Sequence, residues 1–84
     1  MEEKGFKKGD LVKLYNMYEA HIEQPAVVGI YLGTGHEAQF TFYEIAVVKE
    51  SLWSRSERPG GFVERYLASD FLMCHASEDP PLCY

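Results

Sequence analysis

The sequence predicts an all-β fold in which five short strands curl into a small, partly closed barrel. Apolar and polar residues alternate with a period of two in several segments, which is typical of half-buried strands. Glycines, prolines and polar clusters separate these segments as turn signals. No segment carries the sustained 3.6-residue apolar stripe of a helix that packs on a core. Curling is expected because it covers the exposed edges of a sheet with so few strands.

Length and composition predict one domain. The chain has 84 residues, of which 46% are apolar and 25% charged, values close to the globular average. We expect a core over residues 6–76, with terminal extensions over 1–5 and 77–84. No apolar run approaches the length of a membrane span, and no apolar stretch follows the charged start of the chain. The expected location is therefore the cytoplasm, with no membrane partner.

The first strand is expected over residues 11–15, directly after a glycine–aspartate turn signal. Its apolar even positions, Val12 and Leu14, are assigned to the core. Tyr15 is thereby placed on the outside. Residues 16–25 are polar and end in proline, so they predict a long loop.

The second strand is expected over residues 26–33. Its even positions form a continuous apolar face, which we assign to the core: Ala26, Val28, Ile30 and Leu32. Tyr31 is thereby assigned to the outside. Gly29 interrupts the pattern and predicts a bulge or a close approach of two backbone segments.

The third strand is expected over residues 39–49, after a glycine-rich turn. It is rich in β-branched and aromatic residues, and both of its faces are largely apolar. We assign one set of odd positions to the core: Tyr43, Ile45 and Val47. If this strand lies at the edge of the sheet, residues 40–48 would be free to pair with a second chain.

The last third of the chain predicts a loop, two strands and a turn between them. Residues 50–61 form the second long loop and carry the only tryptophan. A strand is expected over 62–67, with Tyr66 facing outward. Residues 68–72 predict a short 3₁₀ turn that Ser69 or Asp70 would cap, and the final strand is expected over 73–76.

The two cysteines, Cys74 and Cys83, lie near the C-terminus. Without an export signal, free thiols in a reducing compartment are expected. The alternative is a disulfide that pins the tail after oxidation in air.

Three segments resemble the small SH3-like barrels. The run GDLVKL over 9–14 resembles their opening strand, residues 29–33 resemble the second, and residues 62–72 resemble the last hairpin strand with its turn and closing strand. The resemblance covers about residues 6–76. Within the SH3-like barrels, the chain is similar to phage-type proteins of unassigned function. It implies a five-stranded SH3-like barrel with a short 3₁₀ turn before the last strand. The acidic loop and paired tryptophan of peptide-binding SH3 domains are absent, so no groove residues carry over.

No spacing in the chain predicts catalysis or a bound group. No nucleophile elbow is present, and the glycines near residue 34 are not followed by a helix that would bind phosphate. The potential metal ligands are scattered rather than paired at the spacing of a zinc site: His21, His36, Cys74, His75 and Cys83. We therefore expect no enzyme activity, no cofactor and no metal.

Protein–protein interaction is the predicted function, as a phage-type accessory module or through self-association. Aromatic residues make up 14% of the chain, and interface cores are enriched in tyrosine, tryptophan and arginine. The candidate partner-binding residues are Tyr15, Tyr31, Trp53, Arg55, Arg58 and Tyr66. The simpler alternative for Trp53 is a lid that folds back over one end of the barrel.

Nucleic-acid binding is the second predicted function, in the manner of an SH3/KOW-like module. The N-terminal segment is rich in lysine, which would contact phosphates, and tyrosines lie nearby for base stacking. The lysines are Lys4, Lys7, Lys8 and Lys13. The net charge of −5 disfavours this function, because binders of the phosphate backbone are usually basic.

Overall fold

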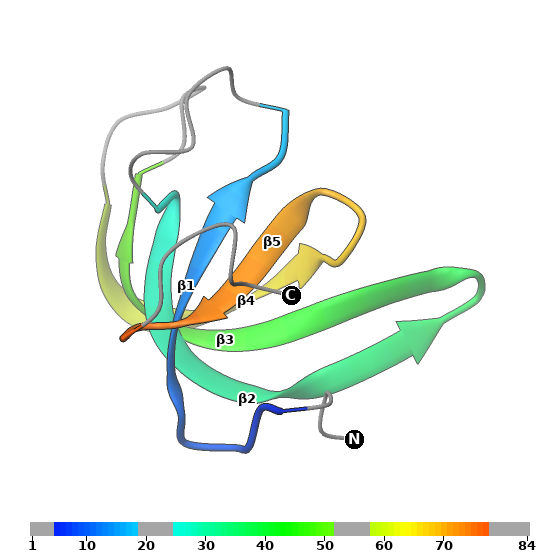
Figure 1. The fold of residues 1–84 in the computed structure, drawn as a ribbon, viewed down its shortest axis with the longest axis horizontal. Helices are drawn as coiled ribbons and strands as arrows, with labels where there is room; N and C mark the ends of the chain where they lie inside the picture. The colour runs from blue at the N-terminus through cyan, green and yellow to red at the C-terminus, as the bar shows by residue number, and fades with distance from the viewer. Residues whose placement is uncertain (1–4, 19–24, 52–57, 78–84) are drawn as a thin grey trace.

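The computed structural model describes residues 5–18, 25–51 and 58–77, and these residues form one antiparallel sheet of five strands (Figure 1). The all-β prediction is therefore confirmed. The strands are β1 (Leu11–Asn16), β2 (Val27–Glu37), β3 (Phe40–Glu50), β4 (Arg58–Leu67) and β5 (Phe71–His75). Their order in the sheet is β4-β3-β2-β1-β5. The sheet is not closed, because its two edges, β4 and β5, do not pair with each other.

β2 and β3 form a long curved hairpin whose tip projects away from β1 and β5 (Figure 1). Register shifts at Val28/Gly29 and at Tyr31/Gly33 accompany the bend of β2. A Cβ on Gly29 would lie 2.5 Å from Ile45 Cγ2 and 2.6 Å from the carbonyl oxygen of Ala46. The close backbone approach predicted at Gly29 is thus confirmed, and only a residue without a side chain fits there.

The core fills the concave side of this curved sheet. The inward assignments for β1 and β3 are confirmed, because both sets are buried. The core consists of Phe6, Val12, Leu14, Ala26, Val27, Tyr31, Tyr43, Ile45, Val47, Tyr66 and Met73.

The inward face predicted for residues 26–33 is confirmed at Ala26, which is buried just ahead of β2, but it is wrong within β2 itself. Val27 and Tyr31 are fully buried, whereas Val28, Ile30 and Leu32 are only half-buried. The strand is apolar on both faces there, so alternation alone did not identify the inner one. The hydroxyl of Tyr31 lies 2.5 Å from Thr34 Oγ1, and this hydrogen bond satisfies its polar end inside the protein.

The outward assignments of Tyr15 and Tyr66 are also wrong, since both side chains are buried. Tyr66 donates a hydrogen bond of 2.5 Å to Oε2 of the buried Glu50, and its ring meets Phe71 edge-on at 5.2 Å. Aromatic side chains with a polar tip are accommodated in a core when that tip has a partner.

Residues before β1 take part in the core through Phe6. Its ring lies 5.9 Å from that of Tyr31 and stacks on His75 at 4.3 Å. His75 Nε2 lies 2.7 Å from the carbonyl oxygen of Gly5. The segment ahead of β1 is therefore held against β5 and the start of the β2 bend.

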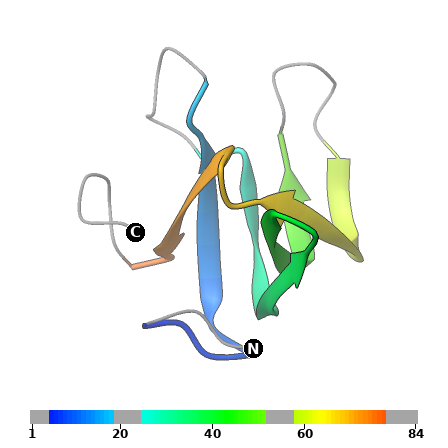
Figure 2. The ribbon, with the colours of Figure 1, turned by 90° about the vertical axis from the view of Figure 1, so that its right-hand side faces the viewer.

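The segment between β4 and β5 is a tight turn rather than the predicted 3₁₀ turn (Figure 2). Asp70 N donates to the carbonyl of Leu67 at 3.0 Å, and Met17 N donates to the carbonyl of Asp70 at 2.9 Å. These bonds fix the turn from both sides, so β5 begins at Phe71, two residues earlier than predicted. Residues 58–61, predicted as loop, belong to β4.

Cys74 is buried and disulfide-bonded, so the expectation of a free thiol at this position is wrong. Cys83, the other cysteine of the chain, lies outside the described residues.

Candidate functional site

The convex face of the sheet carries exposed apolar side chains from β3 and β4. Strand alternation places Phe40 and Phe42 on this face, opposite the core residues of β3. In β4 the alternation exposes Val63, Arg65 and Leu67. The register pairs Phe42 with Leu67, Glu44 with Arg65 and Ala46 with Val63. Antiparallel pairing thus brings residues far apart in the sequence together on one surface.

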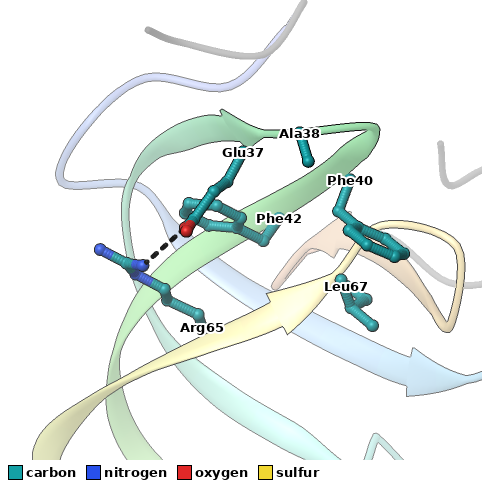
Figure 3. Close-up of a pocket in the computed structure, with 6 residues that line it drawn as sticks. All are labelled: Glu37, Ala38, Phe40, Phe42, Arg65 and Leu67. Atoms are coloured by element: carbon teal, nitrogen blue, oxygen red, sulfur yellow. Dashed lines mark ion pairs between the residues drawn. The ribbon is translucent and has the colours of Figure 1, made fainter.

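Part of this face lines an open hollow of about 420 Å³ beside the β2–β3 turn (Figure 3). We call it the tip hollow. Its lining residues are Glu37, Ala38, Phe40, Phe42, Arg65 and Leu67. The volume lies in the lower part of the range of ligand-binding pockets, about 300–1,000 Å³. The lining is mostly apolar, with one ion pair at one side.

Arg65 forms the polar side of the tip hollow. Its guanidinium carbon lies 4.6 Å from the centre of the Phe42 ring, and Nη1 lies 3.6 Å from Glu37 Oε2. Both charged side chains are well exposed, so the ion pair adds at most about 1 kcal/mol to stability. Both groups therefore remain accessible to solvent.

Phe40 forms the outer wall of the tip hollow and is 52% exposed. It also borders a second, adjoining hollow of about 560 Å³. The other residues that line the second hollow are Gln39, Thr41, Ala68 and Ser69. Phe40 therefore lies between two hollows with about half of its surface accessible to solvent.

The turn that carries Phe40 has an unusual backbone. Ala38 has a positive φ of 55°, a conformation that is uncommon for residues other than glycine. The turn directs the chain so that Phe40 follows at the start of β3, across the strand pair from Glu37.

The predicted partner-binding residues are not brought together on this surface. Tyr15, Tyr31 and Tyr66 are buried and offer a partner no accessible side chain. Trp53 and Arg55 lie outside the described residues. Arg58 is described only as the first residue of β4, with no account of its side chain.

Sequence reasoning missed Phe40, Phe42, Arg65 and Leu67. One signal was present: β3 is apolar on both faces, so one aromatic set exceeds what a single core face requires. The alternation of Val63, Arg65 and Leu67 in β4 was a second signal, since it gives that strand an outer face that is apolar at two of its three positions.

The alternative nucleic-acid interface is only partly described. Lys7 and Lys8 are exposed, while Lys13 lies over the Tyr15 ring with Nζ 5.8 Å from its centre. Lys4 lies outside the described residues. His36 and His75 do not form a metal cluster, since no group of three or more potential ligands occurs among the described residues.

Comparisons with protein-family models, with curated proteins and with solved structures found no match to this chain. Within the described part of the chain, no helix has the length and apolar character that crossing a lipid bilayer requires.

Proposed function

We propose that this protein is a non-catalytic protein–protein interaction module that docks a partner on the tip hollow. The observation that carries the proposal is the exposed cluster of Phe40, Phe42 and Leu67 beside an arginine. The proposal includes an SH3-like character for the domain and a role as an accessory protein of the phage type.

The composition of the tip hollow supports this function. Interface cores are enriched in aromatic residues and arginine, and three lining residues of the tip hollow are of these types: Phe40, Phe42 and Arg65. Phe40 and Leu67 are 52% and 37% exposed, so a partner that covers them removes apolar surface from water. Each Å² of such surface contributes roughly 25 cal/mol when buried.

The lining of the tip hollow also supports a non-catalytic role. Among the described residues that line it, the ionisable ones are Glu37 and Arg65, which pair with each other. Nucleophilic catalysis needs a nucleophile and a base within hydrogen-bond reach of each other, and no serine, cysteine or histidine occurs among these described lining residues.

The proposal is tested by affinity capture from the native host with three forms of the full chain. These are the wild type, the double variant Phe40→Ser/Leu67→Ser, and the control Val48→Ser. Val48 is 54% exposed on the same face but at the far end of β3. Each capture is repeated after nuclease treatment, which removes partners held through nucleic acid.

We expect one protein to be retained by the wild type and by the control, with or without nuclease. The double variant should retain at least tenfold less of it, because hot-spot side chains contribute 2 kcal/mol or more. Equal retention by all three forms would refute the tip hollow as the docking site. A partner lost on nuclease treatment would favour the lysine-rich segment and nucleic-acid binding instead.

A further inference from the structure

β4 leaves one edge of the sheet open. It is the terminal strand of the order β4-β3-β2-β1-β5, and no described strand pairs with its other side. The exposed edge of a sheet presents unpaired N–H and C=O groups that can pair with another extended chain.

The register shows which backbone groups of β4 point toward this open edge. In an antiparallel pair, directly opposite residues alternate between hydrogen-bonded and non-hydrogen-bonded pairs. Ala68 N donates to the carbonyl of Thr41 at 2.9 Å, so Ala68 bonds to β3. Every second residue back along β4 does the same, and in the register of β3 and β4 these residues are Tyr66 and Glu64. The N–H and C=O groups of Val63 and Arg65 therefore point away from β3.

Two hydrogen bonds agree with this assignment. Arg65 N donates to Oε1 of the neighbouring Glu64 side chain at 3.2 Å. The carbonyl of Leu67 accepts from Asp70 N in the turn. The outward amide of Arg65 is thus occupied by a side chain of the same strand, at a distance typical of a weak hydrogen bond.

The side chains beside this edge continue the apolar surface of the tip hollow. Val63 is 59% exposed, and Leu67 lines the tip hollow itself. Apolar side chains that point outward along an edge strand are a liability unless something covers them. An added strand would cover them and pair with the open backbone groups at the same time.

Charge decides which occupant fits. Glu64 lies on this part of β4, Glu44 lies opposite Arg65, and Glu37 forms an ion pair with Arg65. Lys49 lies farther along the strand pair, opposite Pro59. The whole chain carries a net charge of −5. A basic occupant is attracted by this field, whereas a second copy of this acidic chain is repelled.

We propose that the open edge of β4 accepts an extended, basic and apolar segment of a partner protein as a sixth strand. The proposal rests on the function proposed above and adds the mode of binding. Apolar side chains of the segment lie opposite Val63 and Leu67, and one of them enters the tip hollow. A carbonyl of the segment replaces Glu64 at the amide of Arg65. Glu64 is then free to pair with a lysine or arginine directly opposite, a favourable cross-strand pair.

The test begins with a random library of 12-residue peptides displayed on phage and selected against the full chain. We expect enriched sequences in which apolar residues alternate with lysine or arginine. The best selected peptide is then synthesised and its affinity is measured by calorimetry. Glu64→Gln should weaken binding about fivefold.

Two perturbations separate strand addition from docking of side chains alone. Val63→Pro removes an outward N–H, a position where edge strands tolerate proline, and should weaken binding at least tenfold. The control Val63→Thr keeps the N–H and the branched shape, and should weaken binding no more than threefold. In the peptide, N-methylation of the residues whose N–H groups face β4 should weaken binding at least tenfold, and N-methylation of the alternate residues should weaken it little. This measurement needs no substitution in the protein, so it holds even if Val63→Pro does not fold.

The outcomes distinguish the two proposals. Binding that is lost with Phe40→Ser but unaffected by Val63→Pro and by N-methylation in both parities overturns strand addition and leaves the docking site intact. Binding that Phe40→Ser, Val63→Pro and N-methylation all leave unchanged overturns both proposals, as does failure to select any binding peptide. Enrichment of acidic peptides overturns the basic partner. A concentration-dependent dimer that Val63→Pro abolishes identifies a second copy as the occupant, which also overturns the proposal.

Discussion

The ring of Phe42 lies directly over Gly35 of the neighbouring strand. A Cβ on Gly35 would come within 2.6 Å of both Cε2 and Cζ of this ring. β2 therefore contributes a bare stretch of backbone beneath the ring, and Arg65 covers the ring from β4. The shape of the tip hollow depends on an absent side chain as much as on those that line it.

Gly35→Ala is expected to displace the Phe42 ring while leaving the fold intact. The contact is with the far end of a half-buried side chain, so the free energy of unfolding should fall by only about 1 kcal/mol, near the lower limit for overpacking. NMR contacts between the ring and Arg65 should disappear, and binding of the partner should weaken. An unchanged ring position would contradict the role assigned to Gly35.

Gly60→Ala is expected to destabilise the protein much more. A Cβ at this position would lie 2.2 Å from the carbonyl oxygen of Val47 and 2.4 Å from that of Val48. Backbone atoms of a paired strand cannot move aside as a ring can, so we expect a loss of about 3 kcal/mol, the upper range for overpacking. Denaturant unfolding of Gly60→Ala and Gly35→Ala measures the difference between their free energies of unfolding. Equal stabilities of the two variants would refute it.

Tyr66→Phe is expected to reduce the free energy of unfolding by about 1–3 kcal/mol. The substitution removes the donor that lies 2.5 Å from the buried Glu50, and a buried acceptor that loses its donor retains its desolvation cost. Tyr31→Phe is the comparison, because its hydroxyl meets the uncharged Thr34 and a neutral bond contributes about 1 kcal/mol. The larger effect should belong to Tyr66→Phe in urea titrations of both variants.

Phe6→Ala is expected to cost about 3–5 kcal/mol, the usual range for a buried phenylalanine. Phe6 is 2% exposed and packs between Tyr31 and His75. Because small domains are stable by only about 5–15 kcal/mol, this loss is a large share of the total stability, and the melting temperature should fall markedly. Phe6→Leu should recover most of the loss, and thermal melts followed by circular dichroism would show it. A melt of Phe6→Ala like that of the wild type would mean that the segment before β1 is dispensable.

Strand alternation was sufficient to predict part of the fold. In β1 and β3 one face holds the core residues without interruption, so Val12, Leu14 and Ile45 were assigned correctly. In β2 two register shifts, at Gly29 and at Gly33, accompany two apolar faces. In β2 the sequence alone does not show that the hydroxyl of Tyr31 has a hydrogen-bond partner, Thr34, inside the core. Alternation therefore favoured the opposite face.

The candidate site could not be derived from local sequence for a different reason. Phe42 and Leu67 lie on different strands, and only the register of β3 against β4 makes them neighbours. The condition under which residues 40–48 would be free to pair with a second chain is not met for the same reason: β2 and β4 flank β3 on both sides. Pairing between distant segments is set by the whole sheet, which no single segment encodes.

The two faces of β3 have separate roles, which suggests a use in protein engineering. Its inward residues hold the domain together, while the alternate residues Phe40, Phe42, Ala46 and Val48 point the other way. A combinatorial library randomised at those outward positions should therefore yield folded variants with new specificities. The same strand that stabilises the protein would serve as an adaptable template for selecting synthetic binders.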